Sequence, residues 1–135
     1  MSVPKERRTI MIIGATVGIL CVAVVLTAMR TQPQGRTVRS PDGKHNLTDR
    51  DLGQNLACVQ ISRVDDGSLE FQSSISFSRL QKFALAWDAR GRAWLYSSDI
   101  GTYCWKSDGQ GSWVEATIDA DAPREIQDAK PSARR

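Results

Sequence analysis

An uncharged run of 21 residues, Thr9 to Met29, constrains this chain more than any other feature. The run is rich in Ile, Val, Leu, Ala and Gly. As a helix rising about 1.5 Å per residue, it matches the roughly 30 Å hydrocarbon core of a bilayer. A cleavable signal peptide has a shorter apolar region that ends in a small-x-small site. This run ends in Leu-Thr-Ala-Met-Arg, without a good pair of small residues. The sequence therefore predicts one uncleaved transmembrane helix over residues 9–29.

Basic residues lie on both sides of this predicted helix, three in residues 1–8 and four in residues 30–44. The positive-inside rule therefore discriminates poorly between the two orientations. The short basic N-terminal tail, residues 1–8, resembles the start of a signal-anchor. Together with the cysteine usage described below, it favours a domain outside the cytoplasm, in a periplasmic, extracellular or lumenal space.

Gly14 and Gly18 stand four residues apart within the apolar run. This small-xxx-small spacing allows two membrane helices to approach closely, and it predicts a helix–helix contact and a homodimer. Small residues that simply face lipid are the alternative.

The remainder divides by composition into a linker, one domain and a tail. Residues 30–45 combine Pro, Gly, Gln and charge without hydrophobic periodicity, which indicates a solvated tether. Residues 119–135 carry two Pro and mixed charges, which is typical of a flexible tail or a short helix. Between them, residues 46–118 hold seven Lys or Arg against nine Asp or Glu. A slightly acidic domain argues against a nucleic-acid partner, because phosphate binding needs a basic face.

Strand signals dominate this domain. Residues 69–78 alternate apolar and polar side chains, the period-two pattern of a half-buried strand. Residues 56–64 form a second apolar run, and the Asp-Asp-Gly-Ser between the two suits a tight hairpin. Further strands are predicted at residues 83–87, 93–96, 102–106 and 113–118, with Gly-containing turns between them. We expect a mainly β fold: a small antiparallel meander in the form of a curled sheet, a sandwich or a small barrel.

Large aromatic residues gather in the second half of the domain. On strands such side chains fill a core or cover one sheet face, and the alternative is an exposed binding face. The residues predicted for such an interaction surface are Trp94, Tyr96, Tyr103, Trp105 and Trp113.

Residues 97–101, Ser-Ser-Asp-Ile-Gly, followed by Tyr103 and Trp105, resemble the Asp-box turn of sialidase-like and other β-propeller proteins, written Ser-x-Asp-x-Gly-x-Thr-Trp. Tyr103 stands where the pattern has Thr, and Trp105 comes one residue late. In that family the Asp and Gly shape a hairpin and the Trp packs beneath it, so the resemblance implies folding rather than catalysis. Residues 40–44 and 87–92 have similar turn sequences. A closed propeller needs at least four blades of about 40–45 residues, so one or two blade-like sheets are the limit here.

Two of the three cysteines, Cys58 and Cys104, fall in predicted strands, and Cys21 lies in the apolar run. A Cys58–Cys104 disulfide would close a long loop and stabilise the domain by about 3–4 kcal/mol in an oxidising compartment. Two buried thiols that pack as small apolar groups are the alternative. Without a Cys-x-x-Cys spacing, zinc binding is not expected.

No motif for catalysis, metal or cofactor binding is apparent. The single histidine, His45, borders the tether and is expected to be mobile and exposed. There is no Gly-x-Ser-x-Gly elbow, and no calcium or phosphate loop, so no cofactor is expected. Most Asp residues fall in predicted turns, where they shape the backbone.

The sequence therefore predicts a single-pass, membrane-anchored, extracytoplasmic β domain that is not an enzyme. We expect it to act as an interaction module for an unknown protein or envelope polymer, through a strand edge or an aromatic face. Two alternatives stay open. One is a small envelope hydrolase that uses Asp99 or paired carboxylates, and the other is a structural accessory subunit recognised through its transmembrane helix.

Overall fold

The computed structural model describes residues 35–132 of the 135-residue chain. The predicted transmembrane helix at residues 9–29, with Gly14 and Gly18, lies outside the described residues. So do the predicted basic tail and the first part of the predicted linker. Within residues 35–132, no helix has both the length and the apolar character needed to cross a membrane.

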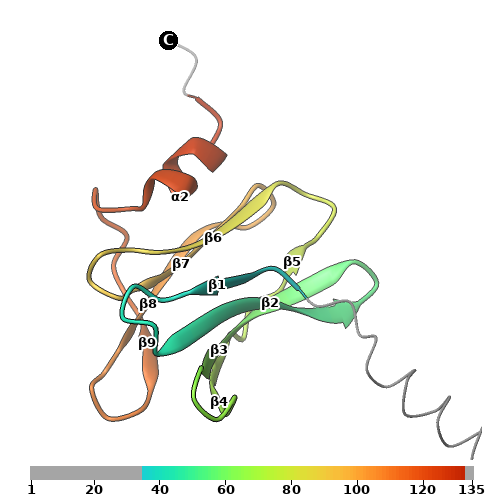
Figure 1. Ribbon diagram of the computed structural model, residues 1–135. Coiled ribbons are helices and arrows are strands. Elements are labelled where there is room, and N and C mark those ends of the chain that lie inside the picture. Colours follow the sequence, from blue (N-terminus) through green and yellow to red (C-terminus); the bar gives the residue numbers. More distant parts are fainter. Residues whose placement is uncertain (1–34, 133–135) are drawn as a thin grey trace, which may run out of the picture. The chain divides into compact units, whose positions relative to one another are not determined.

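The described region is built from antiparallel strands, followed by one short helix (Figure 1). In chain order the elements are β1 (Thr37–Arg39), β2 (His45–Gly53), β3 (Leu56–Arg63), β4 (Leu69–Gln72), β5 (Phe77–Ser78), β6 (Phe83–Trp87), β7 (Ala93–Ser97), β8 (Gly101–Ser107), β9 (Trp113–Glu115) and α2 (Arg124–Ala129). The first sheet has the order β1-β2-β3-β4, with β5 also paired to β3, and the second has the order β6-β7-β8-β9. The prediction of a mainly β, antiparallel meander is confirmed.

The two sheets share one apolar core. Alternate residues of each strand face it, as the period-two geometry of strands requires; Leu47 of β2, for example, pairs with Ile61 of β3, and both are fully buried. The buried members of this core are Leu47, Ala57, Val59, Ile61, Phe77, Leu85, Ala93, Leu95, Trp105 and Trp113.

A second, smaller core lies on the outer face of the second sheet, beneath α2. Ile126 of the helix is fully buried there and packs with Trp94 and Tyr96 of β7. The helix lies within the segment predicted as a tail, where a short helix was one of the two expectations. Its packing means that β7 is buried on both faces.

The turns between strands depend on aspartates that accept hydrogen bonds from nearby backbone N–H groups. Asp42 accepts from the amide of Lys44 at 3.0 Å, and Asp108 accepts from the amide of Gln110 at 2.7 Å. The predicted Asp-Gly hairpin is also present, because Gly67 has a φ of 70° between β3 and β4. These contacts support the expectation that most Asp residues shape turns.

The strand predicted over residues 69–78 is interrupted in the structure. β4 ends at Gln72 and β5 begins at Phe77. Between them, the buried Ser73 hydroxyl accepts a hydrogen bond from the Val59 amide at 3.0 Å and donates to the Ile75 carbonyl at 2.9 Å. The Ser73 hydroxyl thus takes the place of a backbone carbonyl as the hydrogen-bond partner of the Val59 amide. The alternating sequence therefore forms two short strands instead of one continuous strand.

The first described strand, β1, lies before the predicted domain start at residue 46. β1 lies inside the segment predicted as a linker and pairs along β2 from Thr37 opposite Thr48 to Arg39 opposite Asn46. The turn between them closes through Ser40, whose hydroxyl donates to Asp42 at 2.6 Å and accepts from the His45 amide at 3.0 Å.

Candidate functional site

Four of the five aromatic residues predicted as an interaction surface are buried. Trp94 is fully buried, and Trp105, Tyr96 and Trp113 have exposed fractions of 5, 7 and 9%. Tyr103 is half-buried and packs against the core between the sheets. The prediction of an exposed aromatic face is therefore wrong for these residues, since α2 covers one side of the second sheet and the first sheet covers the other.

The predicted disulfide is absent, and Cys58 and Cys104 are buried free thiols. Cys58 stands between the core-facing Ala57 and Val59 of β3, so it points to the opposite face of the first sheet. Cys104 lies in the core beneath α2, on the outer face of the second sheet. The core between the sheets separates the two thiols. Burial raises the pKa of both, that of Cys104 to about 11.

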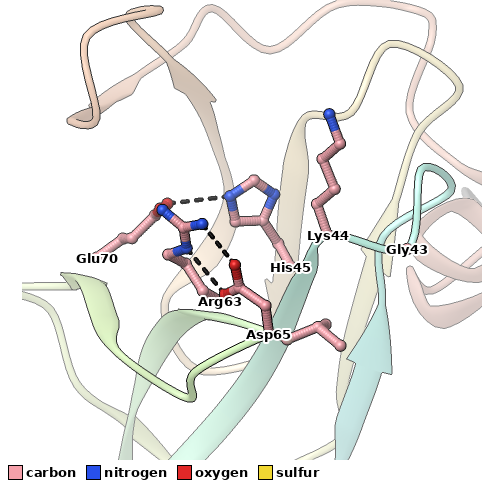
Figure 2. Close-up of a pocket in the computed structure, with 7 residues that line it drawn as sticks. Gly43, Lys44, His45, Arg63, Asp65 and Glu70 are labelled. Carbon is pink, nitrogen blue, oxygen red and sulfur yellow. Dashed lines mark hydrogen bonds and ion pairs between the residues drawn. The ribbon is translucent and has the colours of Figure 1, made fainter.

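A polar hollow of about 430 Å³ lies at one end of the first sheet (Figure 2). Its lining comes from the start of β2, the end of β3, the β3–β4 turn and β4. The lining residues are Gly43, Lys44, His45, Arg63, Val64, Asp65 and Glu70. We call this hollow the polar cleft.

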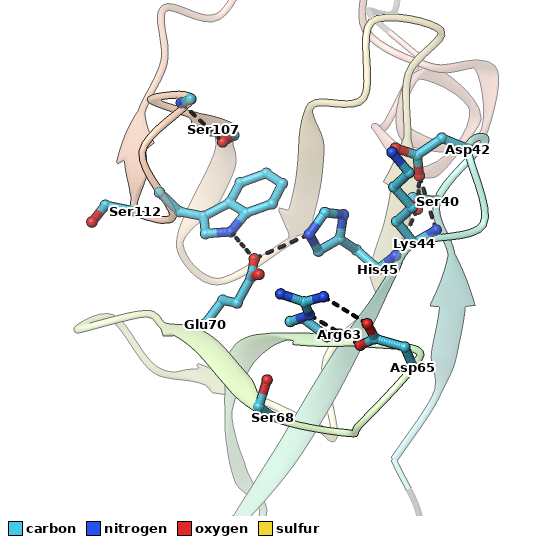
Figure 3. A network of polar contacts seen from close by, with 12 residues as sticks. Ser40, Asp42, Lys44, His45, Arg63, Asp65, Ser68, Glu70, Ser107 and Ser112 are labelled. Atoms are coloured by element: carbon cyan, nitrogen blue, oxygen red, sulfur yellow. Dashed lines mark hydrogen bonds and ion pairs between the residues drawn. The ribbon is translucent and has the colours of Figure 1, made fainter.

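His45 and Glu70 lie at the centre of the network at the cleft (Figure 3), and Trp113 is joined to them through Glu70. The His45 Nε2 lies 3.0 Å from Glu70 Oε2, and the same carboxylate oxygen accepts a hydrogen bond of 3.0 Å from Trp113 Nε1. The imidazole also meets the Trp113 ring edge to face, with centroids 5.3 Å apart at 83°. Glu70 thus joins β2 to the start of β9 through two polar contacts.

Trp87 completes the aromatic surroundings of the imidazole. Its ring centroid lies 6.4 Å from that of His45 and 5.8 Å from that of Trp113. The Trp87 Nε1 donates to the carbonyl of Val38 at 2.9 Å, so this contact links β6 to β1 across the two sheets. The imidazole is therefore held by rings and a carboxylate from separate elements.

Arg63 and Asp65 form the rim of the cleft. The guanidinium makes two parallel hydrogen bonds to the carboxylate, with Nε–Oδ1 at 3.0 Å and Nη2–Oδ2 at 2.6 Å. Hydrogen bonding to Arg63 lowers the pKa of Asp65 to about 2. This carboxylate therefore stays ionised over the physiological range, and it engages two of the five N–H donors of Arg63.

Lys44 is the cation at the cleft without an ion pair among the described residues. Its side chain is exposed, and Figure 2 shows it pointing away from the Arg63–Asp65 pair. Its backbone is fixed, because the Lys44 carbonyl accepts from the Val64 amide at 2.9 Å. The cleft thus offers one exposed ammonium group beside the imidazole of His45.

Sequence reasoning missed His45, which was expected to be mobile and exposed. In the structure it is the first residue of β2, and its side chain has an exposed fraction of 23%. The signal that could have located it is the Ser-Pro-Asp-Gly-Lys turn immediately before it, because such a turn predicts a strand on each side.

Asp99, the residue considered for a hydrolase, lies in the β7–β8 turn. Its carboxylate accepts hydrogen bonds from the Ser97 hydroxyl and, at 2.9 Å, from the Ser78 amide of β5. The Ser97 contact lowers the pKa of Asp99, and the Ser78 amide lowers it further. Gly101 follows with a φ of 92°, and Trp105 is buried in the core. This geometry matches the structural role that the Asp-box resemblance implies.

A second polar cluster lies in the β6–β7 turn and is largely buried. Asp88 accepts from Arg92 Nε at 2.6 Å and from Trp94 Nε1 at 2.9 Å, and Arg92 also binds Asp119 through two hydrogen bonds of 2.8 and 3.2 Å. Burial raises the pKa of Asp88, but the hydrogen bonds outweigh burial and the net pKa is lowered. Every strong donor in this cluster has a partner, so it joins elements rather than presenting groups to a ligand.

No group of three or more His, Cys, Asp or Glu residues in the part of the chain that the structure describes is arranged to hold a metal ion. Comparison with known proteins found no family model, no curated protein and no solved structure that matches the chain.

Proposed function

We propose that this chain is a membrane-anchored, extracytoplasmic binding module that recognises a protein or envelope-polymer partner through the polar cleft. The uncharged run at residues 9–29 supplies the anchor, and the β domain supplies the recognition surface. A binding role rather than catalysis is favoured because the Ser40 hydroxyl near His45 is engaged by Asp42 and the His45 amide.

The observation that carries this proposal is the position of the cleft relative to the point where the chain enters the domain. β1 runs antiparallel to β2, and the Arg36 carbonyl accepts from the Asp49 amide at 3.3 Å. The chain therefore enters the domain from the side of the β2–β3 hairpin. The cleft lies at the other end of β2, at His45, which is four residues and about 13 Å from Asp49 at 3.3 Å per residue. A cleft at that end is open to a partner in the aqueous space.

The chemistry of the cleft favours a partner with an anionic group. Lys44 is free to bind a carboxylate or phosphate, whereas Arg63 is already paired with Asp65. The Glu70 carboxylate is likewise engaged by His45 and Trp113. A charged group of the partner would bind at Lys44 while its other polar groups meet the rim formed by Arg63 and Asp65.

The proposal is tested by capture from solubilised membranes with cleft variants. The full chain in detergent is compared with Lys44→Glu and with Lys82→Glu, an exposed lysine before β6 that does not line the cleft and whose ammonium reaches the Asp128 carbonyl at 3.5 Å. We expect a specific partner to be retained by the unchanged chain and by Lys82→Glu but lost with Lys44→Glu. Equal capture by all three would show that the cleft is not the recognition site.

One observation favours hydrolysis as a second candidate. An imidazole nitrogen 3.0 Å from a carboxylate is the base and orienting pair of nucleophilic hydrolases. The discriminating variant is His45→Gln. Loss of hydrolysis of envelope ester or glycosidic substrates with partner capture unchanged would favour the enzyme. Hydrolysis that persists in the variant would exclude His45 as the base, and no hydrolysis by the unchanged chain would exclude the enzyme.

A further inference from the structure

Three leucines with exposed side chains lie at the end of the domain opposite the polar cleft. Leu52, Leu56 and Leu80 have exposed fractions of 49, 40 and 75%. They account for half of the six exposed large apolar side chains of residues 35–132. Scattered apolar residues are normal on a surface, so this grouping indicates a contact site only together with the position of the chain entry described below.

These leucines belong to adjoining segments. Leu52 and Leu56 are in the β2–β3 hairpin, and Leu56 pairs with Ser78 of β5. Leu80 follows in the β5–β6 loop, where the preceding Arg79 donates its amide to the Asn55 carbonyl at 2.7 Å. We call this end of the domain the leucine end.

Arg79 fixes the leucine end. Its guanidinium lies 2.9 Å from Asp51 Oδ2 and 3.3 Å from Asp49 Oδ2, so it binds two residues of β2 from the β5–β6 loop. The side chain of Asp49 is fully buried. The hairpin and the loop are therefore held together, and the leucines stay at the surface instead of folding onto the core.

The chain also enters the domain at this side. Arg36 is opposite Asp49, and β1, which follows it, runs antiparallel to β2 and away from the hairpin. Only residues 30–34 separate Gly35 from Met29, the last residue of the predicted membrane segment. Even fully extended, this connection covers no more than about 20 Å at 3.3–3.6 Å per residue. An anchored domain must therefore keep this end close to the bilayer.

We infer that the leucine end docks on the bilayer surface, with Leu52, Leu56 and Leu80 at the boundary between headgroups and acyl chains. Arg50 and Arg36, whose guanidinium lies over the Phe83 ring at 5.1 Å, are exposed and would meet lipid phosphates in this orientation. This inference rests on the membrane anchor of the proposed function. It adds a second membrane contact that turns the polar cleft away from the lipid.

The test uses nitroxide labels on the full chain in bilayers of zwitterionic lipid. One label is placed on the native Cys21, which reports on the anchor. Others are placed on Leu80→Cys and Leu52→Cys at the leucine end, and on Gln110→Cys in the exposed β8–β9 turn, all with Cys21→Ala. Cys58 and Cys104 are buried, so the Cys21→Ala chain should take up no label in the folded state.

Collision rates with oxygen and with a water-soluble nickel chelate give the depth of each label. Interfacial apolar groups lie roughly 5–10 Å inside the headgroup boundary, so the oxygen-to-nickel ratio at 52 and 80 should exceed that at 110 by at least about threefold. That result, with Cys21 in lipid, supports the docking.

Three results would overturn it. A lipid-exposed Cys21 with aqueous labels at 52 and 80 removes the docking and leaves the anchor intact. An aqueous Cys21 removes the anchor, and the docking falls with it. Dipolar broadening between labels at 80 would show that a second copy of the chain, not lipid, covers the leucine end.

Discussion

Replacing Asp88 by Ala should destabilise the domain more than any comparable change on its surface. The carboxylate accepts four hydrogen bonds, from Arg92 Nε and Trp94 Nε1 and from the backbone amides of Arg90 and Arg92. Trp94 is fully buried and the Arg92 side chain has an exposed fraction of 10%. The substitution therefore leaves buried donors without a partner.

The size of the effect follows from these contacts. Removing one member of a buried ion pair costs about 3–5 kcal/mol, and an unsatisfied buried N–H costs about 1–3 kcal/mol. Arg92 keeps its two hydrogen bonds to Asp119, which lowers the cost. We expect a total near 4 kcal/mol for Asp88→Ala. Asp88→Asn, which keeps an acceptor oxygen for the amides, should cost about half as much.

The measurement is urea unfolding of the full chain in detergent, followed by tryptophan fluorescence. The matched control is Asp121→Ala, which removes the ion pair with Arg90 in the same turn region; these side chains have exposed fractions of 54 and 66%. An exposed pair contributes less than about 1 kcal/mol, so the control should unfold close to the unchanged chain. The midpoint should shift without a change in slope.

Equal costs for Asp88→Ala and Asp121→Ala would refute this reasoning. That outcome would mean that water reaches the Asp88 cluster in the folded state. It would also mean that the short distances to Arg92 and Trp94 contribute little to the free energy of unfolding.

Three further predictions concern the thiols, the helix and the β7–β8 turn. Alkylation at pH 8 should leave Cys58 and Cys104 unmodified in the folded chain and modify both after unfolding, with or without reductant; a requirement for reductant would contradict the free thiols. Because the pKa of Cys104 rises from 9.0 to about 11 on folding, its contribution to stability is fully present below pH 9 and is lost as the pH rises toward 11, and Cys104→Ala should weaken this alkaline loss. Ile126→Ala should lower the free energy of unfolding by about 2–4 kcal/mol, since the side chain is fully buried beneath the second sheet, and a cost below about 1 kcal/mol would show that α2 is dispensable. Asp99→Ala should lower stability by about 1 kcal/mol and leave partner capture unchanged, whereas loss of function with full stability would return Asp99 to a catalytic role. Because the pKa of Asp99 is lowered on folding, its contribution is present above its ordinary value and lost as the pH falls, and acid unfolding should be less steep in the variant.

The strands of the second sheet could be predicted because their sequence carries clear local signals. β6 was placed at its observed bounds, Phe83–Trp87, and Asp and Gly residues mark the turns on either side of β7. β1 and β2 could not be predicted in the same way. The core-facing positions of β2 include His45 and the buried Asp49 beside Leu47. Because two of these positions are polar, the sequence of β2 does not alternate between apolar and polar residues.

The site was harder to predict, because its parts come together only in the folded chain. Glu70 and Trp113 lie far from His45 in sequence, and only the packing of the two sheets brings them into contact. The aromatic residues were misjudged for a related reason. Trp94 and Leu95 face opposite sides of β7: Leu95 is buried in the core between the sheets, and Trp94 is buried because α2 covers the outer side.

The packing of α2 on the second sheet also has a consequence during translation, because α2 is synthesised after all the described strands. The ribosome completes all the described strands before it adds residues 124–129, so Trp94 and Tyr96 are made well before the side chains that will shield them. Until then the outer face of the nascent second sheet is an exposed apolar surface of the kind that chaperones bind and proteases recognise. Translation products that stop short of Ile126 should therefore be cleared by quality control, although every strand is already in place.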